Sequence, residues 1–197
     1  SDLNNLSDIS FDSAYSANCG ITETELTKTY SPEIDLLAKK YNTTHDAMLS
    51  LLRSKYDGYR FSEKEERIYN PFSICSAFDK KMLGEYWFET GTPTFLVHVL
   101  ERQNFNIADL EGNIKITLDN LDAYKVANEM FIPLLFQAGY ITIKGYDAEL
   151  NRYLLGFPND EVRYAFLKRL LAVYTKAQTE PDGAFVIDEF LYSIRVG

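Results

Sequence analysis

The chain is poor in the residues that most often carry chemistry: its 197 residues include two cysteines, two histidines and one tryptophan. Cys19 and Cys75 lie far apart and form no CxxC pair, which favours reduced thiols and an intracellular, cytoplasmic protein. We expect both to be small buried apolar side chains. Neither His45 nor His98 has a second ligand at metal-binding spacing, so the sequence predicts no metal site.

Several catalytic and nucleotide-binding motifs are absent. The chain contains no GK[ST], no GxGxxG and no GxSxG, which excludes a P-loop, a dinucleotide-binding fingerprint and a nucleophile elbow within these residues. The letters Asp-Lys-Lys at 79–81 fit part of a metal-nuclease motif. They fall at an expected helix end, where a solvated terminus explains them. The sequence therefore predicts no catalytic residue in this chain.

The chain also lacks a long apolar run and an excess of basic residues. No segment approaches the roughly 18 apolar residues that a membrane span needs, and the polar first residues do not resemble a signal peptide. With 29 acidic against 20 basic residues, the net charge is -9, which argues against broad nucleic-acid affinity but not against a local basic patch. The first residue is not Met, so we expect the chain to be cut from a longer polypeptide.

Aromatic side chains and helix signals, in contrast, are abundant. The chain is 46% hydrophobic and contains 14 Tyr and 13 Phe, enough for a substantial core. Apolar residues recur at helical spacing in segments beginning near residues 22, 31, 43, 70 and 92. The expected N-caps and first-turn residues are Thr22 with Glu25 in a capping box, Ser31–Pro32, Asn70–Pro71 and Thr92–Pro93. The expected core-facing positions are Ile34, Leu37, Ala38, Met48, Leu51, Leu52 and Tyr56.

The second half of the chain mixes strand and helix patterns. Residues 67–69 and 114–118 predict short strands, and two alternating runs around a polar turn over 140–157 predict a β-hairpin. A helix containing Pro133 should precede the hairpin and end at Gly139, and a helix capped by Asn159, with Asp160 and Glu161 in its first turn, should follow it. The sequence thus predicts a mainly α protein, a helical bundle followed by a winged-helix-like unit with one β-hairpin.

A winged helix suggests DNA binding, but the composition around the expected wing argues against it. Residues 119–161 contain seven acidic and three basic residues. The helix before the hairpin, MFIPLLFQAG, is nearly all apolar, whereas a recognition helix needs polar and basic residues to reach base edges. We expect this helix to be packed against the protein.

Six motifs occur in order along the chain: LNNLSDISF, YDGYRF, IYNPFS, YWFETGTPTFL, LLFQAGYITIKGYD and LLGFPNDEVRYAFL. Together they resemble the AAA-ATPase-like family, whose members usually carry a C-terminal domain of the PD-(D/E)XK nuclease superfamily. The resemblance implies a helical lid-like region over 1–113, a winged-helix-like region over 114–179, and a linker with the start of a further domain over 180–197. It also implies a parent protein that binds ATP and Mg. The partners of this region would be a P-loop core and a nuclease-like domain of the same polypeptide, and nucleic acid would be bound only through that parent. Walker A and Walker B are absent from the chain.

The resemblance also singles out individual residues. Gly91, Thr92 and Pro93 form a G-x-P motif, which in related ATPases lies at a helix start with its proline near the adenine; simple helix initiation is the alternative. The other family-motif residues are Asn4, Asn5, Tyr56, Gly58, Tyr59, Arg60, Asn70, Pro71, Trp87 and Glu89. Read from the residues alone, YDGYRF predicts a turn held by aromatic side chains in the core, with Arg60 pairing a carboxylate.

Three functions follow as hypotheses. The first is a non-catalytic lid and winged-helix portion of an AAA-type P-loop ATPase, which couples nucleotide state to an attached nuclease-like domain. The second is a protein-interaction module with an exposed aromatic surface, and the third is a winged-helix DNA-binding domain. On the first hypothesis the chain itself is inactive and needs no cofactor of its own.

Overall fold

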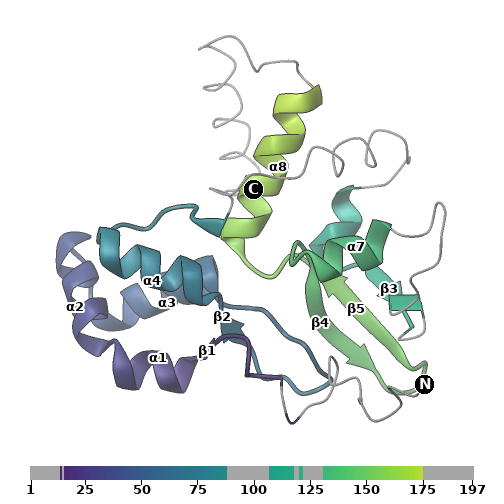
Figure 1. Ribbon diagram of the computed structural model, residues 1–197, viewed down its shortest axis with the longest axis horizontal. Helices are drawn as coiled ribbons and strands as arrows, with labels where there is room; N and C mark the ends of the chain where they lie inside the picture. Colours follow the sequence, from purple (N-terminus) through teal and green to yellow (C-terminus); the bar gives the residue numbers. More distant parts are fainter. Residues whose placement is uncertain (1–13, 15, 88–106, 118–119, 122–130, 175–197) are drawn as a thin grey trace, which may run out of the picture.

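The computed structural model describes residue 14 and residues 16–87, 107–117, 120–121 and 131–174. Two units make up this part of the chain. The helical unit (residues 21–87) lies beside the sheet unit (residues 107–174), and the two segments are far apart in sequence but in contact in space (Figure 1). The predicted helix start at Thr92–Pro93 and residues 122–130 of the helix expected before the hairpin lie outside the described residues.

Four helices form the helical unit: α1 (Glu23–Thr29), α2 (Ser31–Lys40), α3 (His45–Tyr56) and α4 (Pro71–Lys80). The predicted capping box is confirmed, because the Thr22 hydroxyl accepts from the Glu25 N–H and the Glu25 carboxylate accepts from Thr22. Asn70 caps α4 as predicted, and Pro71 occupies its first turn. The prediction for α2 was wrong by one residue, since the N-cap is Tyr30 and Ser31 is already helical.

The core of the helical unit follows the predicted apolar spacing with one exception. Ile34, Leu37 and Ala38 of α2 are buried together, and so are Met48, Leu52 and Tyr56 of α3. Leu51 was also expected in the core, but its side chain is 42% exposed. The core-facing line of α3 is Met48, Leu52 and Tyr56, and residue 51 lies about 100° around the helix axis from residue 52, which places Leu51 outside that line.

A two-stranded antiparallel sheet joins the start and the end of the helical unit. Strand β1 (Ile21–Thr22) pairs with β2 (Ile68–Tyr69), with Ile21 opposite Tyr69. The second strand was predicted, but the first was not. An isolated bridge between Tyr59 and Ile68 extends the pairing toward the sheet unit.

The sheet unit contains the 3₁₀ helix η2 (Ile107–Glu111), strand β3 (Ile114–Ile116), helix α7 (Phe131–Gln137), strands β4 (Thr142–Asp147) and β5 (Arg152–Gly156), and helix α8 (Asp160–Tyr174). The predicted hairpin is confirmed as β4 and β5, and β5 lies between β3 and β4 in an antiparallel sheet. The pairing register shifts between Ile143 and Gly145, so a β-bulge lies at Lys144. Phe131, Pro133 and Leu135 of α7 are buried against the sheet unit's core.

The described residues form six α-helices and two small antiparallel sheets. The helical content was predicted, but the expectation of a mainly α protein was wrong, and the fold is mixed α and β. The sequence signal missed β1 because a strand of two residues has no periodicity. No described helix is long and apolar enough to cross a membrane.

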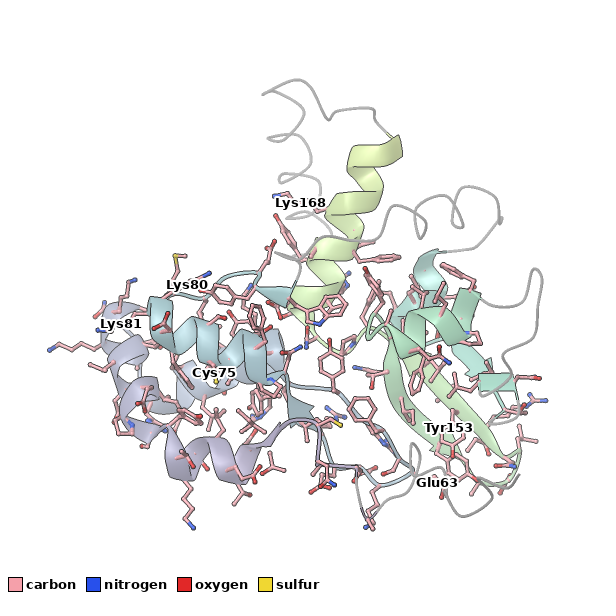
Figure 2. All side chains as sticks on the ribbon, viewed as in Figure 1. Glu63, Cys75, Lys80, Lys81, Tyr153 and Lys168 are labelled. Carbon is pink, nitrogen blue, oxygen red and sulfur yellow. The ribbon has the colours of Figure 1, made fainter. Side chains whose placement is uncertain are left out.

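Both cysteines depart from the prediction. Cys19 and Cys75 are free thiols and both are exposed, where buried side chains were expected. Cys75 lies on the outer face of α4 (Figure 2). Its neighbours in that helix, Ile74 and Ala77, occupy the buried face, which leaves the thiol directed to the surface.

The close approach of Gly58 to the backbone of residue 158 gives a first test. Gly58 has φ of +108°, and a Cβ atom there would lie 2.1 Å from the Pro158 carbonyl oxygen. Gly112 has a similar φ of +112° but nothing within 4 Å of such an atom. We expect Gly112→Ala to lower the free energy of unfolding by about 1 kcal/mol, the cost of the backbone conformation, and Gly58→Ala by about 3 kcal/mol because the clash is added. Urea unfolding of both variants measures the difference, and equal losses would contradict the tight contact.

Candidate functional site

The segment Tyr56–Phe61, the YDGYRF motif, passes from the core of one unit into the core of the other. Tyr56 is fully buried in the helical core, where its hydroxyl accepts from the Gly84 N–H and donates to the Gly84 carbonyl, both at 2.9 Å. Tyr59 belongs to the core of the sheet unit, and its hydroxyl donates to the Gly139 carbonyl at 3.1 Å. The motif therefore lies at the junction of the two units.

Arg60 continues this junction through its backbone. Its N–H donates to the Thr142 hydroxyl at 2.8 Å, and that hydroxyl donates back to the Arg60 carbonyl at 2.9 Å. The guanidinium donates to the backbone carbonyls of Ser62, at 2.9 Å, and Glu63. The expected pairing of Arg60 with a carboxylate was therefore wrong. Two carbonyls of its own loop take that place, so Arg60 shapes the loop.

The loop that follows Arg60 also contacts the hairpin. The Tyr153 hydroxyl of β5 donates to the Glu63 carboxylate at 3.2 Å (Figure 2). Burial is the main cause that raises the pKa of Tyr153 to about 12, and the neighbouring Glu63 adds to it. Tyr153 is therefore a neutral donor at ordinary pH.

Glu161 makes the most extensive polar contact between the units. Its side chain is fully buried, and its carboxylate accepts from the Ser73 hydroxyl at 2.7 Å and from the N–H groups of Tyr86 and Trp87 at 2.6 and 3.1 Å. Burial raises the pKa of Glu161, and these hydrogen bonds oppose the shift. Glu161 of α8 thus holds both α4 and the end of the helical unit.

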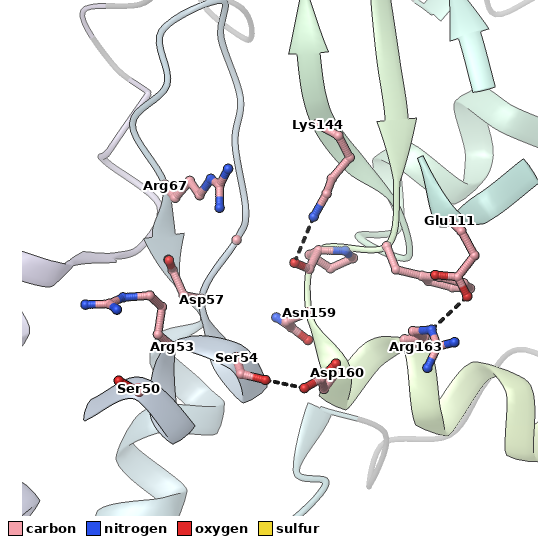
Figure 3. Close-up of a pocket in the computed structure, with 13 residues that line it drawn as sticks. Ser50, Arg53, Ser54, Asp57, Arg67, Glu111, Lys144, Asn159, Asp160 and Arg163 are labelled. Atoms are coloured by element: carbon pink, nitrogen blue, oxygen red, sulfur yellow. Dashed lines mark hydrogen bonds and ion pairs between the residues drawn. The ribbon is translucent and has the colours of Figure 1, made fainter. Parts of the chain in front are cut away.

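A cavity of about 460 Å³ opens at the same junction (Figure 3). The end of α3, the turn at Asp57–Gly58 and Arg67 form one wall. Lys144, the first turn of α8 and the preceding residues 157–159 contribute to the other wall, together with Glu111. The close contact between Gly58 and Pro158 brings the two walls together at one end.

The charged residues around the cavity differ in how far they are paired. Arg53 donates to Glu23 at 2.7 Å through Nε, and Arg163 donates to Glu111 at 2.7 Å. Asp160 accepts from the Ser54 hydroxyl across the cavity. Arg67 makes no hydrogen bond or ion pair with any described residue, and Lys144 reaches only the Pro158 carbonyl at 3.4 Å.

Two buried polar groups on the cavity wall lack a partner among the described residues. Residues Asp57 and Asn159 are each 8% exposed, and Oδ1 of Asp57 and Nδ2 of Asn159 make no hydrogen bond. The other Asn159 atom, Oδ1, accepts from the Val162 N–H and caps α8 as predicted. Burial is the main cause that raises the pKa of Asp57, and nearby Arg67 and Arg53 partly offset it.

The predicted site residues divide into two groups. Asn4, Asn5, Glu89 and the G-x-P residues Gly91, Thr92 and Pro93 lie outside the described residues. The structure brings the others, Tyr56, Gly58, Tyr59, Arg60, Asn70, Pro71 and Trp87, to the junction or to the start of α4. Asn70 links these places, since its N–H donates to the Tyr56 carbonyl at 3.1 Å. The Trp87 ring meets the Tyr140 ring edge-on at 5.0 Å.

Sequence reasoning missed the role of Glu161 and the cavity residues Asp57, Arg67 and Lys144. Glu161 had a sufficient local explanation as an acidic residue in a first helical turn, so nothing in the sequence indicated burial. Lys144 falls in a run of alternating strand residues, and the bulge at this position is a property of strand pairing. Asn159 was predicted as a cap, but its unpartnered amide could not be foreseen.

The described residues contain no group of three or more His, Cys, Asp or Glu side chains that could hold a metal ion. The chemistry that this junction offers is hydrogen bonding and charge.

One curated relative matches the chain closely in sequence. The chain is 42% identical over 178 residues to an uncharacterized protein in the vnfD 5' region of Azotobacter chroococcum mcd 1. The match covers 88% of this chain and 32% of the relative, so the chain spans about a third of the length of the relative. No family model and no solved structure matches the chain.

Glu161 gives a test with a definite sign. Because burial raises its pKa, the folded protein binds this proton more tightly than the unfolded chain does. The stabilisation from the protonated group is fully present below the ordinary glutamate value of 4.5 and is lost as the pH rises through the raised pKa. The free energy of unfolding of the wild type should therefore fall, relative to that of Glu161→Gln, as the pH increases above this value. Denaturant unfolding at a series of pH values measures it.

Glu25 supplies a control of opposite sign. Hydrogen bonds from Thr22 lower the pKa of Glu25, so the stability of the wild type relative to Glu25→Gln should increase as the pH rises through the carboxyl range. Glu161→Ala should lose about 3 kcal/mol at low pH, since three donors lose their acceptor, and the loss should shrink as the pH rises through the raised pKa. A pH-independent difference between wild type and Glu161→Gln would contradict the assignment.

Proposed function

We propose that this chain is the lid and winged-helix portion of an AAA-type P-loop ATPase, a non-catalytic part that couples nucleotide state to an attached nuclease-like domain in the cytoplasm. Six motifs in family order support this proposal. The observation that carries it is that the described residues from two of the most distinctive motifs, YDGYRF and IYNPFS, converge on the junction between the units. A relay between two domains requires such a connection.

The arrangement of the sheet unit supports the winged-helix part of the proposal. Strand β3, helix α7 and the hairpin β4–β5 follow one another, and β5 lies between β3 and β4. In a winged helix a helix likewise precedes a hairpin that pairs with an earlier strand. The buried face of α7, formed by Phe131, Pro133 and Leu135, packs on this sheet unit.

The polar contacts across the junction support a coupling role. Glu161 and Thr142 of the sheet unit bind backbone groups of the helical unit, directly and in a buried setting. A displacement of the helical unit would break these bonds unless the sheet unit moved with it, and unpaired buried groups are costly. The two units should therefore respond to a nucleotide as one body.

ATP turnover tests the proposal. The isolated chain should hydrolyse no ATP, because it contains no P-loop, whereas the parent polypeptide that the proposal requires, with its P-loop core, should hydrolyse it in the presence of Mg. A parent without nucleotide binding would overturn the proposed function.

The G-x-P motif is tested in the same parent. If Pro93 packs near the adenine, Pro93→Ala should weaken nucleotide affinity about tenfold, roughly the effect of one lost apolar contact. Pro71→Ala is the matched control, since Pro71 also lies in the first turn of a helix and has no proposed ligand role. Unchanged nucleotide affinity in Pro93→Ala would leave helix initiation as the role of this motif.

A groove in the helical unit favours a second candidate, a protein-interaction module. The groove encloses about 400 Å³ between α2 and α4 and is lined by Tyr30, Leu36 and Phe78, among others. Leu36 is 54% exposed there, and exposed apolar groups of this kind are typical of contact surfaces.

The protein-interaction candidate predicts that a substitution in the groove weakens binding to a partner. Leu36→Asp should weaken association of the chain with the P-loop core at least about tenfold, the effect of removing one anchor side chain. Leu150→Asp is the control, because Leu150 is similarly exposed, at 58%, on the hairpin turn. Titration calorimetry measures both, and equal affinities would argue against the groove.

The third hypothesis, duplex DNA binding, gains no specific support. Helix α7 carries no charged residue between Phe131 and Gln137, and a recognition helix without polar or basic side chains cannot read base edges.

A further inference from the structure

The cavity at the junction combines unpaired positive charge with unpartnered buried polar groups. Arg67 and Lys144 extend into it from opposite walls (Figure 3). Lys144 lies at the β-bulge between Ile143 and Gly145. Bulges commonly redirect a side chain beside a functional site.

The two cations influence each other. Partial desolvation is the main cause that lowers the pKa of Lys144, and the positive charge of Arg67 lowers it further, while the carboxylates of Asp57, Glu111 and Asp160 on the cavity wall oppose the shift. Two like charges near one cavity repel, and an anion between them would relieve this repulsion. The other two arginines on the wall, Arg53 and Arg163, already donate to carboxylates. Asp160 likewise already accepts from the Ser54 hydroxyl.

The buried groups define a second requirement. Nδ2 of Asn159 is a donor without an acceptor, and Oδ1 of Asp57 is an acceptor without a donor. Buried polar atoms are nearly always hydrogen-bonded, so unpartnered ones in a cavity wall call for an explanation. A ligand that both accepts and donates would satisfy the pair.

We propose that this cavity binds a small phosphorylated molecule that carries a free hydroxyl group. Its phosphate lies between Arg67 and Lys144 and accepts from Asn159, and its hydroxyl donates to Asp57. Arginine and lysine are the usual partners of phosphate. The cavity volume of about 460 Å³ falls within the range of small-molecule sites, and it exceeds what a bare phosphate ion fills.

This ligand goes beyond the proposed function, because every residue in the site belongs to the described part of this chain and no P-loop is involved. Binding can therefore be measured on the 197-residue chain itself. If the cavity binds no ligand, the ATPase proposal still stands. If the parent does not hydrolyse ATP, the proposed ligand site in this chain still stands.

Titration calorimetry at low ionic strength in a phosphate-free buffer provides the test, with ribose 5-phosphate, inorganic phosphate and ribose as probes. Ribose 5-phosphate should bind saturably at one site per chain, inorganic phosphate more weakly, and ribose not measurably. Arg67→Ala and Lys144→Ala should each weaken binding of ribose 5-phosphate about tenfold or more, the usual cost of one charge-assisted hydrogen bond.

Matched controls separate a specific site from general electrostatic attraction. Arg152→Ala and Lys115→Ala remove the same charges from exposed positions that do not line the cavity, and both should bind like the wild type. Circular dichroism checks that every variant is folded. The proposal is overturned if no probe binds saturably, or if the control variants weaken binding as much as the cavity variants do. Equal affinity for ribose 5-phosphate and inorganic phosphate would overturn the hydroxyl contact with Asp57.

Discussion

The arrangement of the two units depends on one buried carboxylate. Glu161 lies in the first turn of α8 and accepts from a hydroxyl and two backbone N–H groups of the helical unit. Burying a carboxylate is unfavourable unless its hydrogen bonds replace those of water. These three donors do so only when α4 and residues 86–87 are correctly placed against α8. Hydrophobic contacts are non-directional, so Glu161 specifies how the units meet, where apolar packing alone would permit several orientations.

The other contacts at the junction depend on the same placement of α8 against the helical unit. With α8 fixed, Pro158 lies against Gly58, a position where only glycine leaves room for the carbonyl oxygen. The segment after Gly58 can then exchange two hydrogen bonds with Thr142 at the start of the hairpin. The YDGYRF motif thus follows from spatial constraints: a glycine for close approach, and tyrosines on either side that anchor one core each.

Local features of this fold were predictable, and features that join distant segments were not. The capping box at Thr22 and the cap at Asn70 involve residues within three positions of each other, so their signal is complete in the sequence. Strand β1 depends on pairing with Ile68–Tyr69, and its own two residues are too few to show an alternating pattern in the sequence. The same limit applies to the site. Tyr56–Phe61 attracted attention as a motif, whereas the burial of Glu161 and the bulge at Lys144 arise only when remote segments pack together.

The cavity is a consequence of the same junction, and its polar wall has a physical cost. Each buried group without a partner destabilises the folded chain by about 1–3 kcal/mol. Asp57 follows α3 and Asn159 caps α8, so both are placed by the elements whose contact closes the junction. Asn159 has a structural reason to be where it is, because its oxygen caps the helix. Asp57 has no such reason for its unpartnered oxygen, and an apolar side chain would avoid the penalty. A carboxylate at that position, in the same cavity wall as an unpartnered amide and near Arg67, fits a wall shaped for a ligand better than one shaped for stability.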